Sequence, residues 1–218
     1  MSKKDIIVRL MPVITFGIIF GFVEAIIVIY LRKIYYPSQT GLFPLRVVDI
    51  NIYRLEVIRE SATIIILSLI SFISSRKLKE VPFLFLLLFG LWDIFYYMFL
   101  FILIRWPSSI AEYDVLFLIP LPWIAPVIAP VLVSSLFVVG SIIYLVKDVS
   151  FSLRQIQIFT AGITLIFVSF VLIAINILLK RGTEGFFRMT PFGFNYPLYS
   201  VGFLILIFSF LRVRFNKI

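Results

Sequence analysis

The chain has 218 residues, 62% of them hydrophobic, and a mean hydropathy of +1.13. Soluble domains are about 45–50% apolar, so the composition predicts a multi-pass membrane protein. Charged residues make up only 14%, against about 25% in soluble proteins, which excludes cytosolic enzymes, disordered regulators and nucleic-acid-binding modules. The net charge of +9 is therefore attributed to basic loops beside anionic lipid.

Two residue types are missing from the sequence, cysteine and histidine. Their absence excludes disulfides, iron–sulfur clusters, cysteine nucleophiles, histidine-ligated haem and Ser-His-Asp triads within this chain. The nucleotide-binding patterns GxxxxGK[ST] and GxGxxG are also absent. We therefore expect no metal and no cofactor, and carboxylates, hydroxyls, lysines and arginines remain as the reactive groups.

Six apolar stretches are long enough, or nearly so, to cross about 30 Å of hydrocarbon as helices. They cover residues 10–31, 56–75, 82–104, 124–146, 156–179 and 197–211. The last is short and needs tilt or local thinning of the bilayer. The first has no small-x-small cleavage site and is interpreted as a retained helix. The sequence thus predicts one all-α membrane domain over residues 1–218, a polytopic bundle of about six transmembrane helices.

The segment between the third and fourth predicted helices is irregular. Ser109 and Glu112 have the spacing of a capping box, which predicts the start of a short helix. Three prolines then interrupt it: Pro120, Pro122 and Pro126. Backbone broken by proline at membrane depth must be covered by protein or line a cavity. We expect an interfacial or re-entrant segment over residues 110–119 that contains this short helix, and a plain kinked fourth helix is the alternative.

Lysine and arginine predict the orientation of the bundle. A small majority of them lie on the side of the N-terminus, and the short basic turn over residues 76–80 is the strongest indicator because short loops follow the positive-inside rule best. We expect both termini to be cytoplasmic and the protein to lie in the plasma membrane.

Three carboxylates within the predicted helices are the main functional clue, because a charge inside a bilayer costs about 2.5–3.5 kcal/mol. Counting about 1.5 Å per residue from the basic helix ends places Glu60, Glu24 and Asp93 about 6, 12 and 18 Å below the same face. The opposite halves of the first and third helices are nearly all apolar, and those of the other helices offer mainly hydroxyl groups. The pattern predicts an outward-facing polar pocket that is closed on the inner side.

The neighbours of these acids extend the candidate site. A Gly-x-x-x-Gly pattern at residues 17–21 shares a helix face with Glu24, so this acid should face another helix and not lipid. Two tyrosines follow Asp93 on its own face, three and four positions later. The candidate residues for binding a ligand or a proton are Glu24, Arg59, Glu60, Asp93, Tyr96, Tyr97 and Asp114. In the structural alternative, Glu24 pairs with Arg59 and the acids only fix helix register.

Three functions fit these observations. The first is binding or transport of a small polar or cationic solute or of protons, with membrane lipid and other membrane subunits as partners and no nucleic acid. The second is a non-catalytic anchor or assembly subunit of a larger complex. The third is a carboxylate-based membrane enzyme acting on a lipid-linked substrate. Tyr113-Asp114 and Asp93 invite comparison with intramembrane aspartyl proteases, but Trp92 replaces a required glycine and the order of the motifs is reversed.

Overall fold

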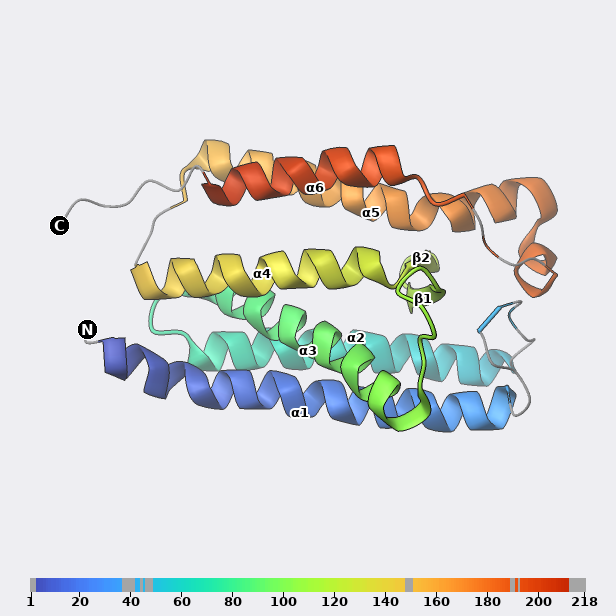
Figure 1. Cartoon of the computed structure of the whole chain (residues 1–218), viewed down its shortest axis with the longest axis horizontal. Coiled ribbons are helices and arrows are strands. Elements are labelled where there is room, and N and C mark those ends of the chain that lie inside the picture. Colours follow the sequence, from blue (N-terminus) through green and yellow to red (C-terminus); the bar gives the residue numbers. More distant parts are fainter. Residues whose placement is uncertain are drawn as a thin grey trace.

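Six α-helices, two short 3₁₀ helices (η1 and η2) and one β-hairpin make up the computed structural model. It describes residues 3–36, 42, 43, 45, 49–147, 151–188, 191 and 193–211. The elements in chain order are α1 (Lys3–Tyr35), α2 (Ile50–Ser74), η1 (Leu78–Glu80), α3 (Val81–Ile104), β1 (Tyr113–Phe117), β2 (Trp123–Pro126), α4 (Ile128–Lys147), α5 (Leu153–Arg181), η2 (Thr183–Phe187) and α6 (Tyr196–Leu211) (Figure 1). The expected all-α bundle of six helices is confirmed.

Five of the helices are long and apolar enough to cross a membrane, and α6, with 16 residues, is shorter. The helices extend beyond most of the predicted ranges, because a helix continues through the charged turns at its ends. In α1, for example, Arg32 and Lys33 lie in the last helical turn instead of ending the helix. The start of α1 and the end of α6 lie at the same end of the bundle (Figure 1).

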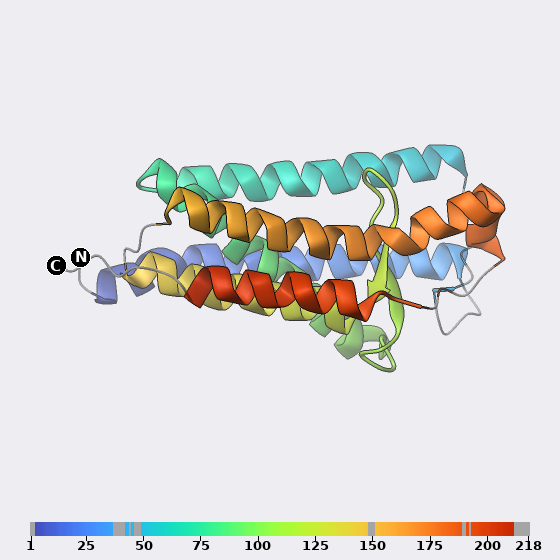
Figure 2. The same ribbon diagram turned by 90° about the horizontal axis from the view of Figure 1, so that it is seen from above.

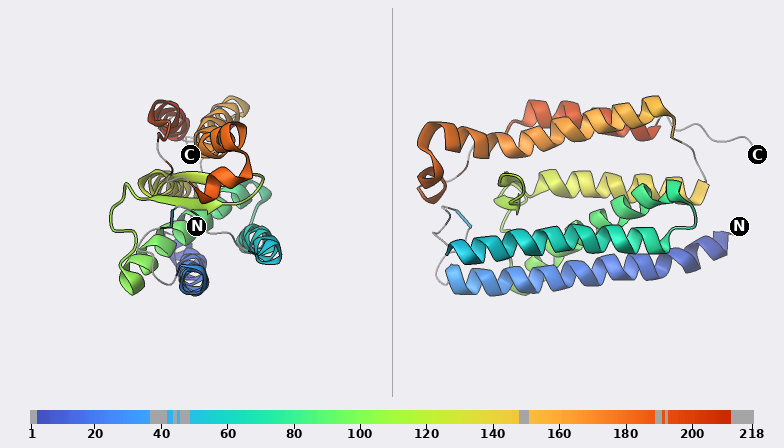
Figure 3. Two further views of the ribbon diagram at one scale, coloured as in Figure 1. Left: turned by 90° about the vertical axis from the view of Figure 1, so that its right-hand side faces the viewer. Right: turned by 180° about the vertical axis from the view of Figure 1, so that it is seen from behind.

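The helices are arranged in layers, with α4 between the α5–α6 pair and the group formed by α1, α2 and α3 (Figures 1 and 3). Close approach of α1 to α3 depends on the Gly-x-x-x-Gly pattern. A Cβ atom added at Gly21 would lie 2.6 Å from the carbonyl oxygen of Trp92 and 3.0 Å from the amide nitrogen of Tyr96. Only glycine tolerates this contact, and the predicted packing of this face against another helix is confirmed.

The expected helix over residues 110–119 is wrong. Tyr113–Phe117 instead pairs antiparallel with Trp123–Pro126, with Tyr113 opposite Pro126 and Val115 opposite Ile124. The physical reason is that this run is rich in aromatic and β-branched side chains, and the prolines after it prevent a helix. Helix α4 accordingly begins at Ile128, four residues after the predicted start at Ile124, which belongs to β2.

The expected capping box is also replaced by a different structure. Glu112 accepts hydrogen bonds from the Trp106 indole (2.6 Å) and from the backbone amide and hydroxyl of Ser108 (2.8 and 2.9 Å). It therefore ties the end of α3 to the start of the hairpin and does not cap a helix. The hairpin runs across the bundle, with its tip beside α2 (Figure 2).

The glycine contact between α1 and α3 gives the first prediction. Gly21→Ala should lower the free energy of unfolding by about 1–3 kcal/mol, because the new methyl group meets backbone atoms of α3 that cannot rotate away. Thermal unfolding in a non-ionic detergent measures this. Val23→Ala, on the exposed face of the same helix, is the control and should change the melting temperature much less. Equal melting temperatures for Gly21→Ala and the unaltered protein would contradict the packing described.

Candidate functional site

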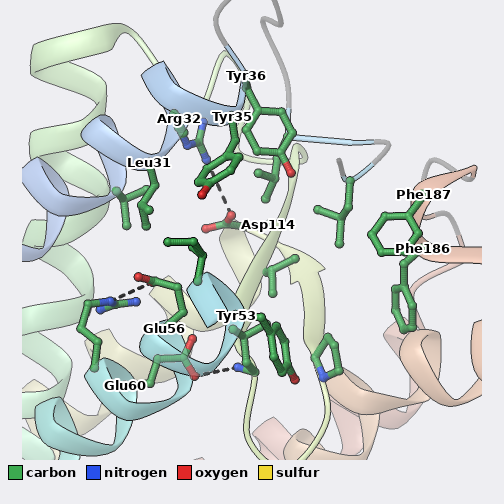
Figure 4. Close-up of a pocket in the computed structure, with 18 of the residues that line it drawn as sticks. Leu31, Arg32, Tyr35, Tyr36, Tyr53, Glu56, Glu60, Asp114, Phe186 and Phe187 are labelled. Carbon is green, nitrogen blue, oxygen red and sulfur yellow. Dashed lines mark hydrogen bonds and ion pairs between the residues drawn. The ribbon is translucent and has the colours of Figure 1, made fainter. Parts of the chain in front are cut away.

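A cavity of about 560 Å³ lies at the end of the bundle opposite the start of α1 and the end of α6. Its walls come from the end of α1, the start of α2, the hairpin, and the end of α5 with η2 (Figure 4). Most lining residues are apolar, and leucine is the most frequent of them. The polar and charged lining residues are Arg32, Tyr35, Tyr36, Tyr53, Glu56, Arg59, Glu60, Tyr96, Asp114 and Thr183.

Arg59 joins two carboxylates in one wall of the cavity. Its guanidinium bonds to Glu24 of α1, and its Nε atom donates to Oε2 of Glu56 at 2.9 Å. Glu24 is only 6% exposed and does not itself line the cavity. This is the pairing that the structural alternative gave for Glu24, and it connects α1 to α2 and keeps the Glu24 charge neutralised.

Glu60, which directly follows Arg59 in α2, has different partners from Glu24. Its carboxylate lines the cavity, is only 7% exposed, and accepts a hydrogen bond from the backbone amide of Leu118 at 2.8 Å. Within the described part of the chain, no lysine or arginine forms an ion pair with Glu60. A buried carboxylate is normally paired with a cation, so Glu60 is the acid that could accept one from a ligand.

Asp114 lies in β1, at the point where the hairpin crosses the bundle. Its Oδ2 atom accepts a hydrogen bond from the Tyr97 hydroxyl at 3.0 Å, and its Oδ1 atom lies 3.7 Å from Nη2 of Arg32. Burial raises the pKa of the Asp114 carboxyl, and Arg32 and the Tyr97 hydroxyl partly offset that rise. The Arg32 guanidinium in turn lies over the Trp106 ring, 3.5 Å from its centroid.

Asp93 lies apart from the cavity, at the interface between α3 and α4. Its Oδ2 atom accepts a hydrogen bond from the Ser134 hydroxyl at 2.8 Å, and the residue is 8% exposed. Of the two tyrosines that follow it on the same helix face, Tyr97 donates to Asp114 and Tyr96 lines the cavity. Asp93 and Asp114 therefore have separate hydrogen-bond partners, which is not the arrangement of a paired aspartyl catalyst sharing one proton.

The structure divides the seven predicted site residues into two groups. Those that line the cavity are Arg59, Glu60, Tyr96 and Asp114, and those behind its walls or away from it are Glu24, Tyr97 and Asp93. Among the described residues, no cluster of three or more acids has the arrangement of a metal site.

Other cavity residues were missed by the sequence analysis. In the sequence, Arg32 marks the end of the first apolar stretch, and Tyr35 and Tyr36 are typical of the aromatic residues at a membrane interface. Glu56 and Tyr53 are one turn and two turns before Glu60, and that helical spacing was the available signal for including them.

Comparisons with known proteins add no functional assignment. No protein-family model matches the sequence, and neither the curated proteins nor the solved structures include a match.

The ion pairs of Arg59 with Glu24 and Glu56 give the second prediction. Arg59→Gln should lower the free energy of unfolding by about 3 kcal/mol, because it leaves the Glu24 charge buried without a partner. The double variant Glu24→Gln/Arg59→Gln should recover most of that loss, since both charges are removed together. Urea or thermal unfolding of the single and double variants tests this. Strictly additive losses would show that the two side chains do not interact.

Proposed function

We propose that this protein binds a small organic cation in the cavity, as a binding or transport protein of the membrane. The observation that carries the proposal is the buried carboxylate of Glu60, which faces the cavity and forms no ion pair with a described residue. Burying an uncompensated charge is costly, and an ammonium group bound in the cavity would remove that cost.

The charge balance around the cavity also favours a cation. Two arginines and three carboxylates line the cavity, a formal charge of −1 when all five are ionised; they are Arg32, Arg59, Glu56, Glu60 and Asp114. Low-dielectric walls strengthen the field of such an excess. A ligand that carries only a negative charge would be repelled by this field.

The aromatic lining of the cavity suits the same ligand class. Tyr35, Tyr53 and Tyr96 contribute rings to the walls, and the face of an aromatic ring attracts a cation by about 0.5–2 kcal/mol. The leucines and phenylalanines around them would hold an apolar body. The ligand supported best is therefore an amine attached to a hydrocarbon or aromatic group, and protons are the simplest alternative cargo.

The setting in the cell follows from the orientation that we propose. With the start of α1 and the end of α6 on the cytoplasmic side, the cavity faces outward from the plasma membrane, at the opposite end of the bundle. The chain contains no nucleotide-binding motif, so any energy for transport would come from an ion gradient or from other membrane subunits.

The third prediction tests the role of Glu60 with 2-phenylethylamine as the probe. Isothermal titration of the purified protein should show saturable binding, and Glu60→Gln should weaken it by roughly 10–150-fold, the equivalent of about 1.5–3 kcal/mol for a bond to a charged group. Glutamine can still accept the hydrogen bond from Leu118, so the variant should remain folded.

The matched control is Glu184→Gln in η2, an exposed acid at the same end of the bundle that pairs with Arg188. This variant should bind the amine as the unaltered protein does. Equal binding by the Glu60→Gln protein would refute the proposal, because the amine would then bind without Glu60.

A further inference from the structure

Arg32 has unmet hydrogen-bonding capacity in the wall of the same cavity. Its Nε and Nη2 atoms are buried and have no acceptor within the described part of the chain. The nearest carboxylate oxygen, Oδ1 of Asp114, is 3.7 Å from Nη2, which is an ion-pair distance and too long for a hydrogen bond. Leaving donors of a charged group buried without acceptors costs more than leaving a neutral donor unpaired.

The surroundings hold Arg32 in this position. The Trp106 ring covers one face of its guanidinium, and the Trp106 indole is itself fixed by its hydrogen bond to Glu112. A planar guanidinium fixed in this way is suited to carboxylate or phosphate oxygens, which can accept two of its N–H groups at once.

Arg32 and Glu60 therefore form a complementary pair of sites along one cavity. Glu60 lies near the hairpin tip and Arg32 near the end of α1, and Asp114 lies between them (Figure 4). We propose that the ligand is a zwitterion with an apolar body, whose ammonium group binds Glu60 and whose carboxylate or phosphate binds Arg32. This inference rests on the proposed function, because it extends the same cation site.

The size and lining of the cavity agree with this ligand class. A volume of about 560 Å³ lies within the range of roughly 300–1,000 Å³ that is usual for small-molecule sites. Leu31, Leu118, Leu121 and Phe186 supply apolar walls beside the charged groups. Two sources share this chemistry, a free amino-acid-like solute and an ethanolamine phospholipid headgroup.

The fourth prediction compares probes that differ in their anionic group. L-phenylalanine is 2-phenylethylamine with an added carboxylate, and for the lipid source dihexanoylphosphatidylethanolamine is compared with octylamine. In titrations of the unaltered protein in a non-ionic detergent, at least one zwitterion should bind 10-fold or more tightly than its matched amine. The pair that shows the difference identifies the source.

Arg32→Gln should abolish the tighter binding of the zwitterion relative to its matched amine. It should not weaken binding of the amine, because only the anionic group contacts Arg32. Arg188→Gln, an exposed arginine whose side chain is 73% exposed, is the control and should keep the advantage. If Arg32→Gln does not fold, Arg32→Lys serves in its place. It keeps the charge but not the planar donors, and the advantage should fall by about 5-fold.

The outcomes separate this inference from the proposed function. If both zwitterions bind no better than their amines while amine binding still depends on Glu60, the zwitterion proposal is wrong and the cation site stands. If the zwitterions keep their advantage in the Arg32 variants, another group receives the anion and the assignment of Arg32 is wrong. If none of the four probes binds, both proposals fail.

Discussion

Backbone amides and carbonyls inside an apolar bundle must find hydrogen-bond partners. This constraint applies to the hairpin between α3 and α4, which consists of two strands and a tip that contains prolines. Strand pairing satisfies part of it, and Glu60 of α2 accepts from the amide of Leu118 at the tip. The hairpin in turn supplies the Tyr113 hydroxyl, which accepts from the backbone amide of Phe194. The same hairpin forms one wall of the cavity, so the requirement for partners explains why polar groups gather there.

The acids of this region fall into two physical classes. Glu24 is bound to Arg59, and Asp114 has Tyr97 and Arg32 beside it, so these charges hold elements together. Glu60 has a backbone amide as its described partner and faces the cavity. The structural role expected as the alternative explanation thus applies to Glu24, and the binding role is proposed for Glu60. Arg59 lies next to both acids, because it is bound to Glu24 across the α1–α2 interface and directly precedes Glu60 in α2.

The sequence was most informative where hydrophobic length or helical spacing decides the structure. The six helices, the glycine face of α1 and the Glu24–Arg59 pair were predictable because they follow from hydrophobic length, from helical spacing and from the cost of buried charge, respectively. The hairpin was not, because short apolar runs near prolines fit a strand or a helix equally well until their pairing partner is known. Asp93 illustrates the same limit, since helical spacing does not reveal that Ser134 of another helix supplies its hydrogen bond.

A structure of the protein with bound 2-phenylethylamine, determined by crystallography or electron microscopy, tests the central claim most directly. The account predicts the ammonium nitrogen within hydrogen-bonding distance of the Glu60 carboxylate, with Arg59 still bound to Glu24 and Glu56. An amine located outside the cavity, or Arg59 turned to neutralise Glu60 while the amine binds elsewhere, would contradict it.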